Sequence, residues 1–588
     1  MPARHLSALV VKPDITDPLA DVSLPSRIDL PGAVSCWIVA RRHLGETAML
    51  TASITGSTLK TLRHTAFALL LTGCLGLPFA PVLAGDPPPV LKAPVVPVPP
   101  LFDQAAVDEA TAALDGIVKS AMKRTGLPGT AVGVVYKDKV IYAKGFGVVE
   151  IGKSGKIDPD TVFLLASVSK PIASTIVAKL VGDGVAKWDD PAKKYNSAFA
   201  LNDPYVTMNA TIADLMSHRS GLRTGSGDLL EDLGFDRAYI LSHLDQQPLD
   251  PFRVTYHYSN FGYTAGGVAA ALAAGKSWED LADEVLFKPA AMTTASYRHA
   301  DYLAHENRAH VHARLKDGSW AAKYERDADA QAPAGGANAS LNDMLRFLRL
   351  QLGNGRLDGK ELVDADALAA THVPQVIPGP PRSPAARASF YGLGWNVSYD
   401  DEGRARVGHS GAFELGAATN VTVMPGENLG IVVLTNGMPI GVAEAIGAAF
   451  FDVAQNGHET VDWVGFLGGI FDQMRAAEAP EIDYTKMPDD PKPARDLGTY
   501  AGTYGNSYYG PLTVSADNGD LAMSMGPQEA PSTFALTHFD GDTFSFETIG
   551  ENANGLAGAI FMIDDGGKAE KVVLDYYDRT GLGTFVRE

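Results

Sequence analysis

Residues 163–184 read FLLASVSKPIASTIVAKLVGDG, a short apolar run followed by an amphipathic segment that ends in a Gly-Asp-Gly turn. The spacing predicts a helix that begins near Ser167 and ends at Gly182. Side chains three residues apart share one helix face, so Lys170 can hydrogen-bond to Ser167. The positive end of the helix dipole would also favour an oxyanion at this point. The segment therefore predicts a serine nucleophile whose proton partner is Lys170. Its apolar stripe comprises Ile172, Ile176, Val177 and Leu180.

A single S-x-x-K match is weak, because the same pattern occurs at 57–60 and at 120–123. Similarly, Lys153-Ser154-Gly155 imitates a K-T-G motif, and Tyr504-Gly505-Asn506 imitates a Y-x-N motif. Matches of this kind taken singly are more often ordinary surface turns or helix faces. Order and context must therefore decide which serine is the nucleophile.

Three motifs run in a meaningful order: Ser167-Val168-Ser169-Lys170, then Tyr258-Ser259-Asn260, then His409-Ser410-Gly411. Their order and spacing resemble the class C β-lactamase and D-Ala-D-Ala carboxypeptidase family of serine hydrolases. The resemblance covers roughly residues 104–456. It implies an α/β (α+β) fold of the serine β-lactamase-like type, with an antiparallel sheet flanked by helices and a helical subdomain. The flanking segments that carry it are GLPGTAVGVVYKDKVIYAKGFG, LMSHRSGL, YSNFGYTAGG, GGANASLNDMLRFL and YGLGWNV.

The residue patterns agree with this architecture independently. They predict a helix over 104–124, a hairpin around Asp138-Lys139, and a mainly helical block over about 185–350. Strands follow in the segments 391–399, 409–424 and 429–436, and then a small-residue helix at 441–454. This order describes an antiparallel sheet with helices packed on it and a helical subdomain inserted.

The residue pattern changes near the carboxyl end of the chain, where short strand-like segments alternate with turn signals. We expect a hydrolase domain over 102–478, a linker over 479–496, and a separate all-β domain over 497–588. Turn signals such as Asp517-Asn518-Gly519-Asp520 recur there at sheet-like spacing. GTYAGTYGNSYYGPLTV and VLDYYDRTGLGTFVRE resemble the lipocalin-like β-barrel domain appended to some members of the family.

The amino-terminal part of the sequence is typical of a targeting segment. Residues 60–84 have a basic start, an apolar run and small residues at the end, so we expect a signal peptide over 49–84 with cleavage after Ala84. Residues 1–48 then come from a start codon assigned too far upstream, and 85–101 form a proline-rich linker. The protein is accordingly expected in the periplasm or secreted. The apolar run is too short and broken for a stable membrane span. A competing interpretation is a lipobox ending at Cys74, which would leave a lipid anchor there.

Composition excludes several classes of function. Acidic residues outnumber basic ones by 69 to 49, a formal charge of −20 that opposes nucleic-acid binding. Both cysteines, Cys36 and Cys74, precede the folded part, so neither a disulfide nor a catalytic thiol is expected there. His310 and His312 lack a third ligand nearby and read as ordinary strand histidines. We expect no metal and no organic cofactor.

The resemblance implies a role for each motif residue. Ser167 attacks a carbonyl, Lys170 takes its proton, and Tyr258 is a second proton shuttle that protonates the leaving group. Asn260 holds the amide side of the substrate, and His409 is a catalytic residue that opens the strand lining the site.

The residues that follow on that strand, Ser410, Gly411 and Ala412, are expected to bind substrate. The backbone N–H groups of Ser167 and Ala412 would form the oxyanion hole.

One departure from the family concerns His409, where the antibiotic-hydrolysing members have lysine. Histidine is largely neutral near pH 7, so it offers no permanent cation for a substrate carboxylate. Efficient β-lactamase activity is therefore not expected, and members with histidine here resemble peptidases, amidases and esterases. His218 is interpreted as structural, and His257 points to the opposite side of its strand from Tyr258.

The leading hypothesis is a secreted serine peptidase or amidase that acts on a short peptide through an acyl-enzyme. The substrate would be a wall-derived peptide or a linearised cyclic peptide of the microcystin type. A carboxylesterase is the alternative, because the same site serves both reactions. A third reading is a penicillin-binding sensor that is acylated without turnover.

Overall fold

The computed structural model describes residues 100–588 apart from positions 382, 385 and 401. The predicted signal peptide, the segment before it, both cysteines and the S-x-x-K match at 57–60 lie outside the described residues. Nearly all of the linker 85–101 lies outside them too. No helix in the described part is long and apolar enough to cross a bilayer.

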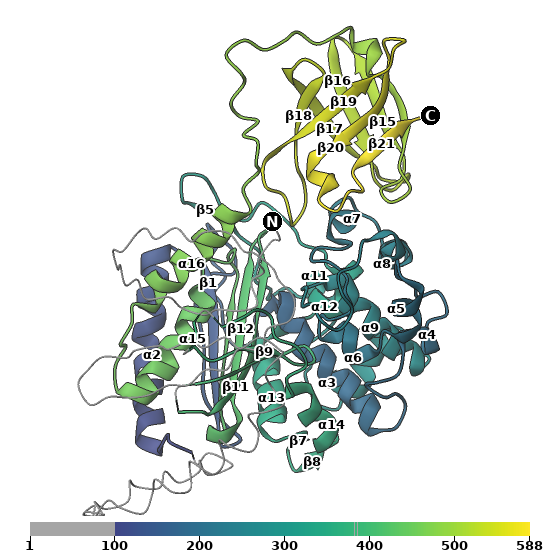
Figure 1. The fold of residues 1–588 in the computed structure, drawn as a ribbon. Helices are drawn as coiled ribbons and strands as arrows, with labels where there is room; N and C mark the ends of the chain where they lie inside the picture. Colours follow the sequence, from purple (N-terminus) through teal and green to yellow (C-terminus); the bar gives the residue numbers. More distant parts are fainter. Residues whose placement is uncertain (1–99, 382, 385, 401) are drawn as a thin grey trace, which may run out of the picture. The chain divides into compact units, whose positions relative to one another are not determined.

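A seven-stranded antiparallel sheet forms the centre of the first domain (Figure 1). Its strands, in spatial order, are β2 (Lys139–Gly147), β1 (Gly129–Tyr136), β13 (Leu429–Thr435), β12 (Ala417–Met424), β11 (Ala405–Phe413), β10 (Asn396–Tyr399) and β9 (Phe390–Tyr391).

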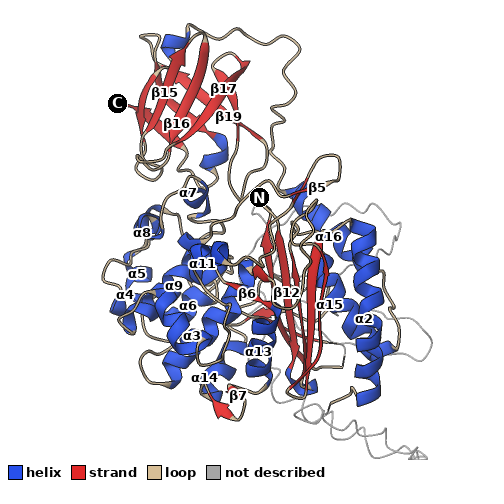
Figure 2. Cartoon of the chain, turned by 180° about the vertical axis from the view of Figure 1, so that it is seen from behind, coloured by secondary structure: helices blue, strands red, loops and turns tan. Residues whose placement is uncertain are grey.

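Helices cover both faces of this sheet (Figure 2). On one face lie α2 (Gln104–Thr125) and α15 (Val442–Asn456), and α16 (Trp463–Ala477) packs against α15. On the other face lies α13 (Leu341–Leu352) together with the helical block. That block contains α3 (Ser169–Gly182), α4 (Ala192–Tyr195), α5 (Pro204–Asn209), α6 (Ile212–Met216), α7 (Asp228–Asp232), α8 (Arg237–Ser242), α9 (Asn260–Ala273), α10 (Trp278–Ala282), α11 (His299–Ala304), α12 (Ala332–Gly335) and α14 (Ala365–Ala369).

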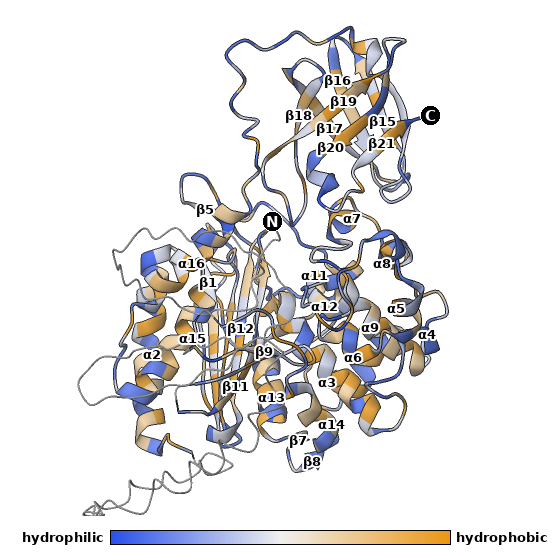
Figure 3. Ribbon diagram, viewed as in Figure 1, coloured by the Kyte–Doolittle hydropathy of each residue, from blue (hydrophilic) through white to orange (hydrophobic). Residues whose placement is uncertain are grey.

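Because both faces are covered, the central strands β1 and β13 are buried at every position, and most of their residues are apolar (Figure 3). Successive side chains of β1 point to opposite faces. Val132 and Val134 belong to the core under α2 and α15, whereas Ala131 and Val135 belong to the core under the helical block. One sheet thus supports two cores, and its second face carries the site described below.

The predicted order of elements is confirmed, with two differences of detail. The segment 409–424, expected as one strand, is a hairpin of β11 and β12 that turns at Glu414–Gly416, where Gly416 has φ +137°. Helix α16 is not predicted by the sequence patterns. Its sequence contains three glycines, which lower intrinsic helix propensity, and its packing against α15 supplies the stability that propensity does not.

The C-terminal domain is a closed eight-stranded antiparallel barrel, as expected. The predicted turn at 517–520 connects two of its strands, with positive φ at Asn518 and Gly519. The strands are β14 (Gly502–Gly505), β15 (Leu512–Asp517), β16 (Asp520–Met525), β17 (Ser532–Asp540), β18 (Thr543–Glu547), β19 (Leu556–Ile563), β20 (Ala569–Leu574) and β21 (Thr584–Arg587), and β14 pairs with β21 to close the ring.

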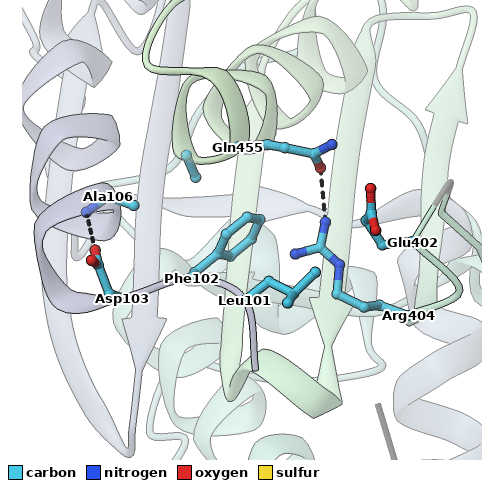
Figure 4. A pocket seen from close by; sticks show the side chains of 8 residues that line it. Leu101, Phe102, Asp103, Ala106, Glu402, Arg404 and Gln455 are labelled. Atoms are coloured by element: carbon cyan, nitrogen blue, oxygen red, sulfur yellow. Dashed lines mark hydrogen bonds between the residues drawn. The ribbon is translucent and has the colours of Figure 1, made fainter. Parts of the chain in front are cut away.

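The first described residues are anchored by a buried ion pair. The N–H groups of Leu101 and Phe102 donate to the carboxylate of Glu427, which also accepts from Arg404 at 3.1 Å. Both charged side chains are almost fully buried, at 3% and 1% exposed. Figure 4 shows the small pocket beside Arg404, where Gln455 accepts a further hydrogen bond from the guanidinium. This pocket is lined by residues other than those of the S-x-x-K, Y-x-N and H-S-G motifs.

Removing the acid of this pair should destabilise the first domain. Glu427→Ala would leave the buried Arg404 with one carboxylate fewer and two backbone donors without their acceptor, at a cost of about 3–5 kcal/mol. Denaturant unfolding measures the change. The matched control is Lys486→Ala, which removes an exposed pair with Asp483 and should cost less than about 1 kcal/mol. Equal losses in the two variants would contradict the anchoring role of Glu427.

Candidate active site

Ser167 sits in a tight turn between a short strand and the helix that follows it. Strand β3 (Val162–Leu164) leads into a 3₁₀ turn, Ala166–Val168, and α3 begins at Ser169. Ala166 has φ +47°, a left-handed conformation that costs a residue with a side chain about 1–3 kcal/mol. Ala166 and Val168 are buried, whereas Ser167 between them is half-buried. The turn therefore presents the serine hydroxyl at the edge of the core.

Lys170 lies one turn further on and is fully buried. Its Nζ is 3.1 Å from Ser167 Oγ, 2.9 Å from Asn260 Oδ1 and 3.0 Å from the carbonyl oxygen of Ala334. Burial lowers the pKa of this amine well below its usual value, while the charge of Asp228 acts in the opposite direction.

These three neighbours determine how a neutral amine would be oriented. An amide oxygen and a carbonyl oxygen can only accept, so the two hydrogens of a neutral Lys170 point to Asn260 and Ala334. Its lone pair then points at the hydroxyl of Ser167, which can donate to it. The arrangement can remove a proton from Ser167.

Tyr258 approaches the same hydroxyl from another side. Its O–H donates to Ser167 Oγ at 2.8 Å, and its ring centroid is 4.4 Å from Lys170 Nζ. Burial raises the pKa of Tyr258 far above its usual value, so the phenol keeps its proton at ordinary pH. The serine oxygen can therefore accept from Tyr258 while donating to Lys170.

The Y-x-N motif brings Asn260 to the same place. Ser259 is extended and caps α9 by accepting from the N–H of Gly262, so Tyr258 and Asn260 project on the same side. Asn260 Oδ1 accepts from Lys170, and Asn260 Nδ2 donates over 3.5 Å to Asp228 Oδ2.

His218 packs beneath Tyr258, as its structural interpretation predicts. The two ring centroids are 4.5 Å apart, and His218 Nδ1 accepts from the N–H of Ser259 at 3.2 Å. His257 instead lies 2.8 Å from Asp250, away from the serine. His218 thus supports the tyrosine without touching the hydroxyl of Ser167.

His409 on β11 is buried, and both of its ring nitrogens are occupied. Nδ1 lies 2.7 Å from the carbonyl oxygen of Ser410, which can only accept, so Nδ1 carries the proton. Nε2 then accepts from the hydroxyl of Tyr391 at 3.0 Å. Burial, helped by the charge of Lys170, lowers the pKa of His409 to about 3. His409 is therefore a neutral ring held against Tyr258 at a centroid distance of 6.3 Å.

Strand β11 separates the other predicted residues by the alternation of its side chains. Gly411 faces Ser167: a Cβ there would lie 2.2 Å from the carbonyl oxygen of Leu165 and 3.1 Å from the nitrogen of Ser167. The hydroxyl of Ser410 points to the opposite face and accepts from Asn420 at 3.1 Å. The side chain of Ala412 points to the same face of β11 as that of Ser410, away from Ser167. Ala412 can therefore offer its backbone N–H to the site.

The single motif matches at 120–123, 153–155 and 504–506, which we call decoy motifs, lie away from Ser167. Ser120 and Lys123 are exposed on α2, and 153–155 form an exposed turn. Tyr504 is buried in the barrel, where its hydroxyl donates to the carbonyl oxygen of Tyr500. Within the described residues no cluster of three His, Cys, Asp or Glu side chains could hold a metal.

Three contributors were missed by sequence reasoning: Asp228, Tyr391 and the carbonyl of Ala334. Each comes from a segment far from Ser167 along the chain, and a backbone carbonyl has no sequence signature. The Gly-rich turn before Asp228 was the only local signal for that residue.

The chain is similar to known families in both of its parts. The profile of the family described as Beta-lactamase matches residues 114–452, and a profile described as a domain of unknown function (DUF3471) matches residues 486–582.

Two relatives are similar over most of their own length. Unguisins hydrolase ungD of Aspergillus violaceofuscus is 23% identical over 81% of this chain and 90% of its own. Penicillin-binding protein 4 of Amycolatopsis lactamdurans is 28% identical over 64% of this chain and 93% of its own.

The octameric penicillin-binding protein homologue from Pyrococcus abyssi has a similar fold, with a TM-score of 0.52 at 18% identity over 81% of this chain and 99% of that one. The expected fold is thereby confirmed. Since the family profile matches more than half of its residues, the chain belongs to the Beta-lactamase family of serine hydrolases.

Proposed function

We propose that this protein is a secreted serine peptidase or amidase that cleaves a short peptide through an acyl-enzyme on Ser167. One observation carries the proposal: the only direction in which a neutral Lys170 can accept a proton is toward Ser167, because its two hydrogens are engaged by Asn260 and Ala334. The name hydrolase borne by the relative from Aspergillus violaceofuscus supports bond cleavage with turnover.

The reaction would proceed in two halves. Ser167 Oγ forms a bond to the substrate carbonyl carbon while its proton passes to Lys170, and the carbonyl oxygen becomes an oxyanion. The N–H groups of Ser167 and Ala412 would stabilise this charge. As the carbon–nitrogen bond breaks, Tyr258 donates its proton to the leaving amine, and the proton that Lys170 took from Ser167 passes to Tyr258. A water molecule then attacks the ester carbonyl and gives one proton to Lys170. The ester bond to Ser167 Oγ breaks, the acid leaves, and Ser167 Oγ regains a proton from Lys170.

The neutral state of His409 supports a peptide rather than a β-lactam antibiotic as substrate. A ring whose nitrogens are occupied by Ser410 and Tyr391 offers no cation to a substrate carboxylate. Wall-derived peptides and linearised cyclic peptides of the microcystin type are the classes we propose to test. The predicted signal sequence at 49–84 supports periplasmic or extracellular action.

A fluorophosphonate probe should label Ser167, because it reacts with activated serines. Intact mass spectrometry and peptide mapping should show one adduct on the wild type and none on Ser167→Ala. The matched control is Ser120→Ala, which removes the serine of the exposed decoy motif and should be labelled like the wild type. Labelling of Ser167→Ala at another residue would remove Ser167 from its role. Turnover assays then separate the three hypotheses. Release of product from peptides but not from esters would indicate a peptidase, and release from esters but not from peptides would indicate an esterase. A stable acyl adduct on Ser167, formed from substrate without release of product, would indicate a sensor.

Lys170→Met keeps much of the volume of the side chain and removes its amine. Loss of a general base should lower kcat/KM by about 10²–10⁴-fold. Lys123→Met, on the exposed decoy motif, should leave kcat/KM unchanged. A normal rate in Lys170→Met would contradict the proton transfer assigned to Lys170.

The pH dependence of the rate should report Lys170. A base must be unprotonated to act, so kcat/KM should rise as pH rises through the pKa of Lys170 and level off above it. Burial brings that pKa down from the usual range of lysine. With a pKa of about 3, His409 is neutral throughout the range from pH 5 to 9. The decrease of kcat/KM toward low pH, the acidic limb of the profile, should therefore remain in His409→Asn even if the rate of this variant is lower. Disappearance of the limb in His409→Asn would assign it to the histidine.

A further inference from the structure

Asp228 lies behind the site, at the start of α7. Gly227, with φ +93°, precedes it, and a Cβ at Gly227 would lie within 2.9 Å of the ring of Phe261 on α9. This close packing brings α7 against the beginning of α9. Asp228 Oδ2 is 3.5 Å from Asn260 Nδ2, and Asp228 Oδ1 is buried with no hydrogen-bond partner in the described part of the chain.

The neighbours of Asn260 distinguish the oxygen of its side-chain amide from the nitrogen. Lys170 donates in either protonation state, so it requires the amide oxygen. A carboxylate accepts only, so it requires the amide nitrogen. Asp228 and Lys170 therefore favour the same one of the two orientations of Asn260, and a flipped amide would place donor against donor and acceptor against acceptor.

We propose that Asp228 is a positioning residue of this active site, whose carboxylate fixes the amide of Asn260 and thereby aims the amine of Lys170 at Ser167. The inference rests on the proposed function and adds to it a residue that orients Asn260 without contacting the substrate.

The charges around Asp228 support an electrostatic link to the amine as well. Burial raises the pKa of Asp228 to about 7, with Glu231 and Asp232 acting in the same direction and Lys170 against them. Above that pH Asp228 is a carboxylate, which requires the amide nitrogen of Asn260, and its charge stabilises the ammonium form of Lys170. The titratable groups that interact with Asp228 are Lys170, Tyr258, Glu231, Asp232, Tyr508 and Tyr576.

Helix α7 is held firmly enough for this role. Glu231 accepts from Arg326 at 2.8 Å, and both side chains are only 6% exposed. Gln331 also donates to Glu231, and the same stretch of chain continues to Ala334, whose carbonyl oxygen accepts from Lys170. Asp232, at the end of α7, accepts from the N–H of Glu551 at 2.7 Å. The helix that carries Asp228 is therefore tied on both sides.

The test compares Asp228→Asn with the wild type, using a nitrophenyl ester or any peptide that is turned over. The amide introduced by Asp228→Asn could present either of its ends to Asn260, so the orientation of Asn260 would be held by Lys170 alone. We expect kcat/KM to fall on the order of 10–100-fold, as for a small misplacement of a catalytic group. Loss of the negative charge lowers the pKa of Lys170, so the acidic limb should also move to lower pH. Asp245→Asn makes the same change of charge on an exposed residue and should alter neither rate nor limb.

The outcomes separate this inference from the proposed function. Failure of the wild type to be labelled at Ser167 would overturn both. Normal labelling of the wild type, together with an unchanged rate and limb in Asp228→Asn, would overturn the role of Asp228 alone. A reduced rate with an unmoved limb would show a merely structural role and would overturn the positioning role too. If Asp228→Asn does not fold, Asp228→Ala, which also removes the carboxylate, is measured in the same way.

Discussion

The burial of one amine, that of Lys170, is the constraint on which the site depends. A fully buried ammonium is costly, and the cost is relieved either by an ion pair or by loss of the proton. Here the nearest partners are two neutral oxygen acceptors and a hydroxyl, and the carboxylate of Asp228 stands one amide away. The environment therefore favours a neutral amine, whose lone pair has only the direction of Ser167 left to it.

The surrounding fold holds this geometry through buried tyrosines and close backbone approach. The hydroxyls of Tyr263 and Tyr297 donate to the carbonyl oxygens of Lys170 and Ser169, in the first turn of α3. On the other side Gly411 lets β11 approach the turn that carries Ser167, at distances that leave no room for a Cβ. The turn that carries Ser167 is thus held between helix α3 and strand β11, regular elements that position it more accurately than loops would.

The sequence was sufficient for the order of elements, for the C-terminal barrel and for the proximity of Ser167, Lys170, Tyr258 and Asn260. Each of these follows from local spacing or from motif order. It was insufficient where a contact depends on tertiary packing. The hairpin of β11 and β12 was interpreted as one strand, since a three-residue turn interrupts the apolar pattern only briefly. Asp228 and Ala334 could not be found by spacing, because they lie far from Lys170 along the chain and meet it only through α7, α9 and α12. Ser410 was grouped with the site by its motif, whereas strand parity turns its side chain away.

The state of His409 follows from hydrogen bonding more firmly than from its identity as histidine. A lone imidazole near pH 7 is poised between charge states, yet this ring donates its proton to Ser410 and accepts one hydrogen bond from Tyr391. A second proton would have to displace Tyr391 and would lie near Lys170, and both effects oppose it. Strand β11 thus presents a neutral, hydrogen-bonded imidazole beside Ser167. The peptide substrate proposed above would therefore be recognised along β11 through backbone groups and shape rather than through a cation.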